Sequence, residues 1–85
     1  MNFGEAMYVV LRGGIVYYTH GSFEDSGIPA HRIFADYNNR ICIEQYCPDL
    51  TTSVDGYFNL GFFYPTQEDL SSSYTQVYHG KYVRV

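Results

Sequence analysis

Histidine, cysteine and carboxylate side chains are the groups of this sequence that could bind a metal or carry out catalysis. The three histidines, His20, His31 and His79, lie far apart, and the chain holds no Cys-x-x-Cys or His-x-x-x-His pair. Zinc sites of recognisable type need such short spacings between their ligands. The sequence therefore predicts no metal site and no bound cofactor.

The two cysteines suit packing better than reaction. Cys42 lies between Ile41 and Ile43, and burial at such a position raises the pKa of a thiol. Cys47 precedes Pro48 and is the more reactive candidate. If both lie on one strand, their odd spacing directs them to opposite faces. We therefore predict two free thiols, which are typical of a reducing cytosol.

Neither the acidic residues nor the glycines form a catalytic motif. Acid–base catalysis needs two carboxylates held in different environments, whereas the pairs Glu24-Asp25 and Glu68-Asp69 are only adjacent in the chain. The stretch Arg12-Gly13-Gly14 follows a helical pattern, while a phosphate-binding loop opens a helix. We therefore predict a binding protein and not an enzyme.

Composition limits the chain to one small acidic domain. It has 85 residues, a formal net charge of −4 and a pI of about 5.0. Without a basic stripe we expect no binding to a nucleic acid polymer, and no apolar stretch reaches the length of a membrane span. No secretion signal is recognisable, which predicts a cytoplasmic protein. So small a core is marginally stable alone, and self-association is the remaining way to stabilise it.

Aromatic residues make up 19% of the chain, with ten Tyr, six Phe and no Trp. Tyrosine is enriched at interfaces and in binding loops. It is also common in β-rich domains, so both interpretations stay open at this point.

These residues must be positioned by a helix and several strands, and the helix comes first. Asn2 is a favourable N-cap, and Glu5 has the spacing of its capping-box partner. Gly13 and Gly14 provide the stop. Apolar residues recur at the spacing of one buried helix face, namely Phe3, Ala6, Met7, Val10 and Leu11.

Antiparallel hairpins are predicted for the middle of the chain. Residues 15–19 are β-branched and aromatic and predict a strand, and residues 20–29 predict a loop. A hairpin joins residues 31–37 to 40–46, because asparagine at 38 and 39 tolerates the positive φ of a tight turn. A second hairpin is predicted around positions 55 and 56, with residues 51–54 pairing with 57–63.

The last quarter of the chain predicts one helical turn and then a strand or hairpin. Thr66 and Asp69 have the spacing of a capping box after Pro65. Residues 74–85 predict the terminal strand or hairpin, broken at Gly80. The sequence thus predicts an α+β fold in a single ligand-binding domain over residues 1–85: a short N-terminal helix, an antiparallel sheet of hairpins and one short helical turn near the C-terminus.

Two segments near the ends of the chain carry a family likeness. The first is Met1-Asn2-Phe3-Gly4-Glu5-Ala6 followed by Arg12-Gly13-Gly14-Ile15-Val16, and the second is Phe63-Tyr64-Pro65-Thr66-Gln67-Glu68-Asp69-Leu70. They resemble the opening helix and the near-terminal Trp-x-Pro-Ser-Gln-x-Asp-Leu/Met motif of the second type of Thoeris anti-defence family, a group of phage-encoded nucleotide-signal sponges. The chain departs from that family in having no Trp: Phe63 stands at the motif position, and Phe23 and Tyr74 lie near the other two.

The resemblance implies a phage protein that acts in the cytoplasm of the host cell. Family members bind cyclic ADP-ribose-type signals made by bacterial TIR-domain proteins, and some bind cyclic dinucleotides. They sequester the signal without cleaving it, so the Thoeris effector stays inactive. They assemble as homo-oligomers with pockets between protomers, which implies a dimer or tetramer here.

A nucleotide ligand needs an aromatic face for its base and donors for its pyrophosphate, and the candidate donors are Arg32, Arg40, Thr66, Gln67 and backbone amides at the start of the short helix. Each candidate also has a structural alternative, since Phe63 suits a core and Thr66 with Asp69 suits a helix cap. The net charge opposes an anionic ligand, although surface charges beyond about 8 Å are screened at physiological salt. The predicted ligand-binding residues are Phe23, Arg32, Phe63, Tyr64, Thr66, Gln67, Asp69 and Tyr74.

Two rival functions come from other classes. One is an acidic, Tyr-rich inhibitor that blocks a host defence protein directly. The other is a nucleotide-processing enzyme that uses Cys47 or a distant histidine.

Overall fold

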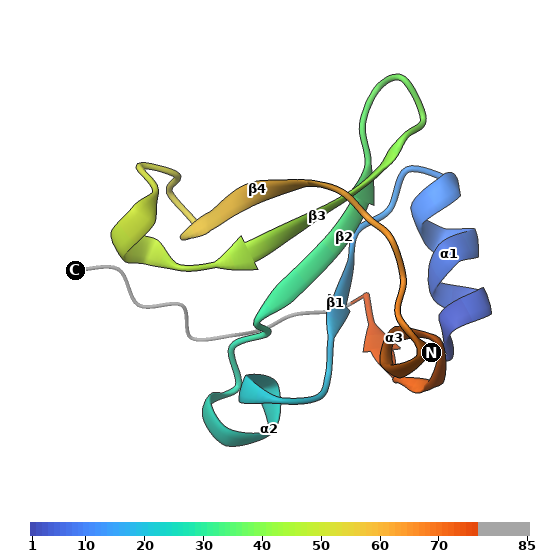
Figure 1. The fold of residues 1–85 in the computed structure, drawn as a ribbon, viewed down its shortest axis with the longest axis horizontal. Coiled ribbons are helices and arrows are strands. Elements are labelled where there is room, and N and C mark those ends of the chain that lie inside the picture. The colour runs from blue at the N-terminus through green and yellow to red at the C-terminus, as the bar shows by residue number, and fades with distance from the viewer. Residues whose placement is uncertain (77–85) are drawn as a thin grey trace.

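Helices flank one antiparallel sheet in the computed structural model, which describes residues 1–76 (Figure 1). Within that range the strand order is β4-β3-β2-β1-β5, with antiparallel neighbours throughout. The predicted α+β class is confirmed. The elements in chain order are α1 (Phe3–Leu11), β1 (Val16–Tyr18), α2 (Ser22–Ser26), β2 (His31–Ala35), β3 (Ile41–Tyr46), the 3-10 helix η1 (Pro48–Leu50), β4 (Tyr57–Phe62), α3 (Gln67–Ser71) and β5 (Tyr74–Thr75).

The predicted first helix is present as α1 with its capping box. The side chain of Asn2 accepts from the Glu5 N–H at 2.8 Å, and the Glu5 carboxylate accepts from the Asn2 N–H at 3.0 Å. Two of the four N–H groups that a helix start leaves unpaired are satisfied in this way. At the other end, Gly13 takes a φ of 94°, which favours glycine and ends the helix.

The first predicted hairpin is confirmed as the β2–β3 pair. Its strands run in register from His31 opposite Gln45 to Ala35 opposite Ile41. The turn is somewhat longer than predicted, because the Asp36 carboxylate accepts two backbone N–H groups at 2.9 Å and organises residues 36–40. Asn39 has a φ of 63° in that turn. This is the positive φ that the sequence predicts an asparagine to adopt there.

The second predicted hairpin is wrong. Strand β4 pairs with β3, from Tyr57 opposite Tyr46 to Phe62 opposite Cys42, and residues 51–54 form no strand. Local side-chain bonds replace strand pairing there: Asp55 accepts from the hydroxyl of Ser53 at 2.8 Å and from the N–H of Tyr57 at 3.1 Å. Short polar side chains that bond to nearby backbone groups compete in this way with the hydrogen bonds between paired strands.

The predicted loop over residues 20–29 also needs correction, because residues 22–26 form the short helix α2. Gly27 ends it with a φ of 76° and donates its N–H to the carbonyl of Phe23 at 2.9 Å. A one-turn helix with glycines on both sides has no apolar periodicity from which it could be predicted. The terminal element is described only as β5 at Tyr74–Thr75, and the rest of the predicted hairpin, including Gly80, lies outside the described residues.

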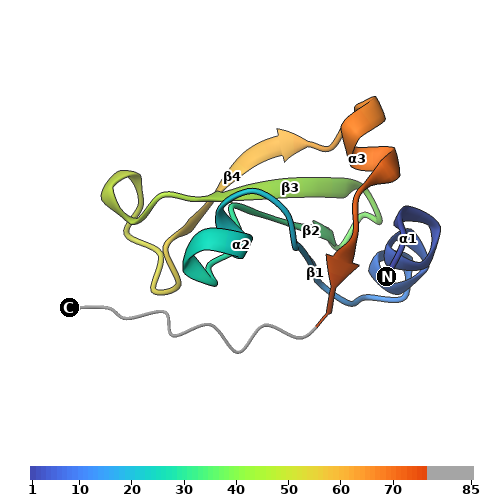
Figure 2. The ribbon, with the colours of Figure 1, turned by 90° about the horizontal axis from the view of Figure 1, so that it is seen from below.

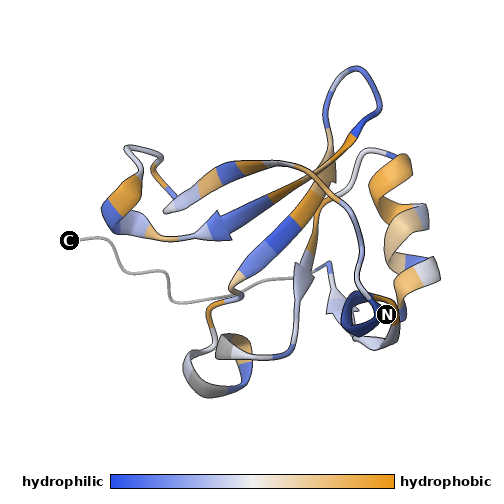
Figure 3. Ribbon diagram, viewed as in Figure 1, coloured by the Kyte–Doolittle hydropathy of each residue, from blue (hydrophilic) through white to orange (hydrophobic). Residues whose placement is uncertain are grey.

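The core lies between α1 and the β2-β1-β5 part of the sheet. Helix α1 packs at this end of the molecule beside α3 (Figure 2), and its apolar residues contrast with the hydrophilic turn between β2 and β3 (Figure 3). Phe63 packs at the edge of this core, with its ring 6.2 Å from that of Phe3. The buried cluster comprises Ala6, Val10, Val16, Tyr18, Ile33 and Tyr74.

No helix found in residues 1–76 is long and apolar enough to cross a membrane.

Two glycines of the N-terminal region should respond oppositely to alanine. A Cβ at Gly14 would lie 2.5 Å from Cγ1 of Val9, so Gly14→Ala forces helix and strand apart; such overpacking costs about 1–3 kcal/mol of unfolding free energy. A Cβ at Gly4 would meet only the Asn2 side chain, at 3.6 Å, so Gly4→Ala should stabilise α1 by up to about 1 kcal/mol. Urea unfolding of both variants measures this, and equal effects would contradict the packing described.

Candidate ligand-binding site

One cavity of the described structure is lined by aromatic, histidine and acidic side chains. It lies at the end of β1, beside α3. It has a volume of about 380 Å³, within the range typical of small-molecule sites. We call it the Tyr18 pocket. Three elements with their connecting loops build it, so residues far apart in the sequence meet there. Its lining residues are Tyr18, His20, Gly21, Ala30, His31, Thr66, Glu68 and Asp69.

A buried hydrogen bond between Tyr18 and Asp69 holds the wall of this pocket. The Tyr18 hydroxyl donates to Oδ1 of Asp69 at 2.8 Å, while the Thr66 N–H donates to Oδ2 at 2.8 Å. In return Thr66 Oγ1 accepts from the Asp69 N–H at 3.2 Å, which completes the predicted capping box. Tyr74 adds a third tie, because its hydroxyl donates to the Asp69 carbonyl at 2.6 Å.

Burial and the neighbouring carboxylate keep both tyrosines protonated. Burial first, and then the hydrogen bond to Asp69, raises the pKa of Tyr18 far above its ordinary value of 10.0. Burial, with a smaller effect of Asp69, raises the pKa of Tyr74 to about 12. Both hydroxyls therefore act as hydrogen-bond donors at neutral pH.

Two histidines pack against Tyr18 and supply aromatic faces. The His20 ring is stacked on the Tyr18 ring with centroids 4.6 Å apart, and the His31 ring is tilted at 5.1 Å. Burial lowers the pKa of His31; Asp69 raises it less strongly, and His20 lowers it further. His31 is therefore neutral at pH 7. Nδ1 of His20 is buried and has no hydrogen-bond partner, an arrangement that is costly in a folded protein.

The predicted site residues divide between this pocket and other places. Thr66 and Asp69 line the pocket, and Tyr74 lies behind it with its ring 5.4 Å from that of Tyr18. Gln67 is exposed on α3, and Tyr64 is 78% exposed just before it. The segment that carries the family likeness thus forms one wall of the cavity.

The other predicted residues lie elsewhere. Arg32 is on the opposite face of β2 from His31, because successive strand residues point to opposite faces. There its guanidinium pairs with Glu44 at 2.6 Å and Asp55 at 2.7 Å, and it lies over the Tyr57 ring at 4.3 Å. The residue predicted to bind pyrophosphate is thus held by two carboxylates. Phe63 packs against the core, which is the structural role that the sequence offered as the alternative to ligand binding. Phe23 is half-buried on α2.

Sequence reasoning did not single out Tyr18, His20 or His31 as neighbours of one site. Alternation along β1 and β2 gives Tyr18 and His31 the same face as the buried Val16 and Ile33. That alternation could have shown from the sequence which face of each strand Tyr18 and His31 occupy. It did not reveal that α3 covers the same place, since this contact is made across 51 residues of chain.

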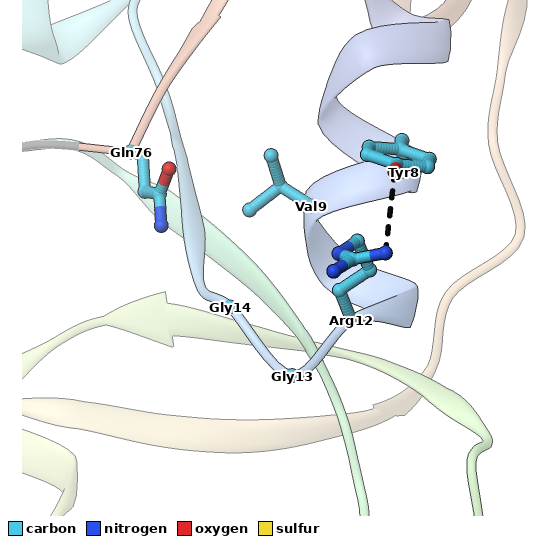
Figure 4. Close-up of a pocket in the computed structure, with 6 residues that line it drawn as sticks. All are labelled: Tyr8, Val9, Arg12, Gly13, Gly14 and Gln76. Carbon is cyan, nitrogen blue, oxygen red and sulfur yellow. Dashed lines mark hydrogen bonds between the residues drawn. The ribbon is translucent and has the colours of Figure 1, made fainter.

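A second cavity, of about 360 Å³, lies where α1 turns into β1 (Figure 4). Its lining includes Tyr8, Arg12 and Gln76, and we call it the Arg12 pocket. Arg12 donates to the Tyr8 hydroxyl at 3.2 Å and lies over the Tyr8 ring at 5.3 Å. Arg40 pairs with Asp36 at 3.2 Å, so Arg12 is the one arginine among residues 1–76 without a carboxylate partner.

The remaining reactive residues form no further site in the described part of the chain. Cys42 and Cys47 are free thiols, as predicted. Burial raises the pKa of the Cys42 thiol, which agrees with the packing role predicted for it. Among residues 1–76 no three His, Cys, Asp or Glu side chains are grouped so that they could hold a metal ion.

His31 should make the fold sensitive to acid. Its folded-state pKa lies below the ordinary 6.5, so the stability it contributes is present above pH 6.5 and is lost as the pH falls below that value. We expect a lower urea midpoint at about pH 5.5 than at about pH 7.5, the range in which histidine titrates. In His31→Gln the difference between the two pH values should shrink, and a difference as large as in the wild type would refute this role.

Comparisons of the sequence with models of known protein families, with curated proteins and with solved structures found no match. The resemblance drawn from the two terminal segments therefore rests on their residues alone. The function must be inferred from the chemistry of the pocket.

Proposed function

We propose that this chain is a binding protein that captures a cyclic ADP-ribose-type signal, or a related cyclic dinucleotide, and sequesters it without cleavage. The ligand occupies the Tyr18 pocket. The observation that carries the proposal is that the Pro65–Leu70 segment, which resembles the sponge family, contributes Thr66, Glu68 and Asp69 to the lining of a cavity of ligand size.

The lining side chains support recognition of a nucleotide base. Tyr18, His20 and His31 supply three rings, and the centroids of the two histidine rings lie 4.6 and 5.1 Å from that of Tyr18. Planar bases stack on such surfaces in a sequence-tolerant way, and each stacked base contributes about 1–3 kcal/mol. Glu68 and Thr66 add polar groups at the rim, which orient a ligand.

Asp69 and Tyr18, the two groups joined by the buried hydrogen bond, are poorly placed to act as a general base. Both carboxylate oxygens of Asp69 accept hydrogen bonds from Tyr18 and Thr66. The Tyr18 hydroxyl stays protonated, because its pKa lies above the ordinary value. A general base must be free to take a proton, whereas both Asp69 oxygens are engaged by these hydrogen bonds and the Tyr18 hydroxyl already carries its proton.

A homo-oligomer, dimer or tetramer, completes the proposal. The family that the chain resembles holds its ligands between protomers. Exposed apolar side chains are available for such contacts, including Leu60, Phe62 and Tyr64, which are 48%, 49% and 78% exposed. A phage-encoded protein of this kind would act in the cytoplasm of the infected cell and deprive a Thoeris effector of its signal.

The same apolar side chains favour a second candidate function, direct inhibition of a host defence protein. Strand β4 is at the edge of the sheet formed by the described residues, and it carries Leu60 and Phe62. An exposed edge offers unpaired backbone groups to a partner strand. This candidate predicts a stable heterocomplex on size exclusion and no retention of a small molecule.

Retention of ligands tests the proposal. The purified protein is mixed with cyclic ADP-ribose isomers and cyclic dinucleotides, filtered, and then heated to release what it holds. We expect one nucleotide to be retained and released intact. Release of a cleaved product, or no retention of any nucleotide, would refute sequestration.

Variants locate the ligand in the same assay. His31→Ala should lower retention about tenfold, the loss expected when one stacking contact worth at least about 1.4 kcal/mol is removed. Asp49→Asn changes an exposed residue outside the Tyr18 pocket and should retain ligand as the wild type does. Loss of retention in Arg12→Gln, with His31→Ala unaffected, would assign the ligand to the Arg12 pocket instead.

A further inference from the structure

We infer that the Tyr18 pocket admits the uncharged nucleoside part of its ligand, a planar heterocycle with sugar hydroxyls, and leaves every phosphate outside. This inference deepens the proposed function and rests on it. It reverses the expectation from the sequence, which assigned pyrophosphate donors to the same neighbourhood.

The distribution of charge is the first support. Among the described residues, the lining includes the acidic Glu68 and Asp69 and neither Arg nor Lys. The arginines of residues 1–76 lie elsewhere: Arg32 and Arg40 are paired with carboxylates, and Arg12 lines the other cavity. Within the described part of the chain, a phosphate in the Tyr18 pocket would meet two acidic residues and no arginine or lysine, and contacts between like charges are repulsive.

The neutral ring of His31 does not offset these negative charges. The pKa of His31 lies below its ordinary value because the ring is buried, so it carries no positive charge at neutral pH. It therefore presents a ring face and one N–H donor. An aromatic surface without charge suits a nucleobase.

The carboxylate of Glu68 favours a ligand that carries hydrogen-bond donors. Glu68 is exposed on α3, and among the described residues its carboxylate has no hydrogen bond or ion pair; only its backbone carbonyl is engaged, by the hydroxyls of Ser71 and Ser72. An ionised carboxylate can only accept. The vicinal hydroxyls of a ribose and the amino group of a base donate, and acidic residues bind ribose hydroxyls in dinucleotide sites. A phosphate has only acceptors to offer when ionised.

The hydroxyl of Thr66 is compatible with the same ligand. Its Oγ1 accepts from the Asp69 N–H, so its hydrogen is free to donate to a ring nitrogen or a sugar oxygen. The lining thus combines Glu68 as acceptor and Thr66 as donor with the rings of Tyr18 and His31, and it matches both the polar edge and the apolar face of a nucleoside.

Paired ligands that differ by one phosphate test this inference. Binding of adenosine and of AMP to the full chain is measured by calorimetry or NMR titration at low salt. We expect AMP to bind at least about threefold more weakly than adenosine, which is the effect of one like charge at about 7 Å in a water-like dielectric. In Glu68→Gln the ratio should approach one, and in the charge-matched control Asp49→Asn it should stay unchanged.

The outcomes separate this inference from the proposed function. Tighter binding of AMP than of adenosine by the wild type, or an unchanged ratio in Glu68→Gln, would overturn the inference while retention of an intact cyclic nucleotide still upheld sequestration. Binding of adenosine with no retention of any cyclic nucleotide would uphold the nucleoside pocket and refute sequestration. Failure to bind adenosine, AMP and the cyclic nucleotides alike would refute both.

Discussion

The hydrogen bond between Tyr18 and Asp69 is the interaction on which the described structure depends most. It joins β1 to the start of α3 across 51 residues. Helix α3 has five residues, too few to be stable by itself, so its position is set by what its first turn contacts. The carboxylate of Asp69 caps the helix through Thr66 and fixes it to the sheet through Tyr18. One side chain thus both starts the helix and anchors it.

The two faces of the sheet carry different kinds of polar contact. On the face that holds Arg32, an ion-pair network with Glu44 and Asp55 lies over the ring of Tyr57 and fastens β4 and its preceding turn to the centre of the sheet. On the other face, Tyr18 and His31 border a cavity. The strand β2 serves both, because neighbouring residues alternate between faces. Arg32 is paired with two carboxylates and therefore serves the fold. The face of Tyr18 and His31 is the one that offers a cavity to a ligand.

Local signals in the sequence predicted the elements whose stability is local. The capping boxes of Asn2 with Glu5 and of Thr66 with Asp69 satisfy groups within one turn, and the asparagine turn joins adjacent strands. The misplaced partner of β4 has a long-range cause, since Asp55 is engaged by Arg32 and by its own turn.

The same distinction explains the candidate site. The Pro65–Leu70 segment was identified from its residues, and three of them line the cavity. The histidines were weighed as metal ligands and as catalytic residues of a rival enzyme. They were not predicted as aromatic lining, because that role comes from packing on Tyr18 and no spacing in the sequence encodes it. Arg32 was predicted to bind pyrophosphate from its charge alone, and charge does not reveal which carboxylates a fold brings to it.

Removal of one hydroxyl tests the central claim most directly. Tyr18→Phe keeps the ring and deletes the donor to Asp69, which leaves a buried acceptor unpaired and costs about 1–3 kcal/mol. Tyr37→Phe is the matched control, because Tyr37 is 95% exposed. The account predicts that Tyr18→Phe lowers both the free energy of unfolding and the retention of nucleotide, while Tyr37→Phe changes neither. Wild-type stability and retention in Tyr18→Phe would contradict it.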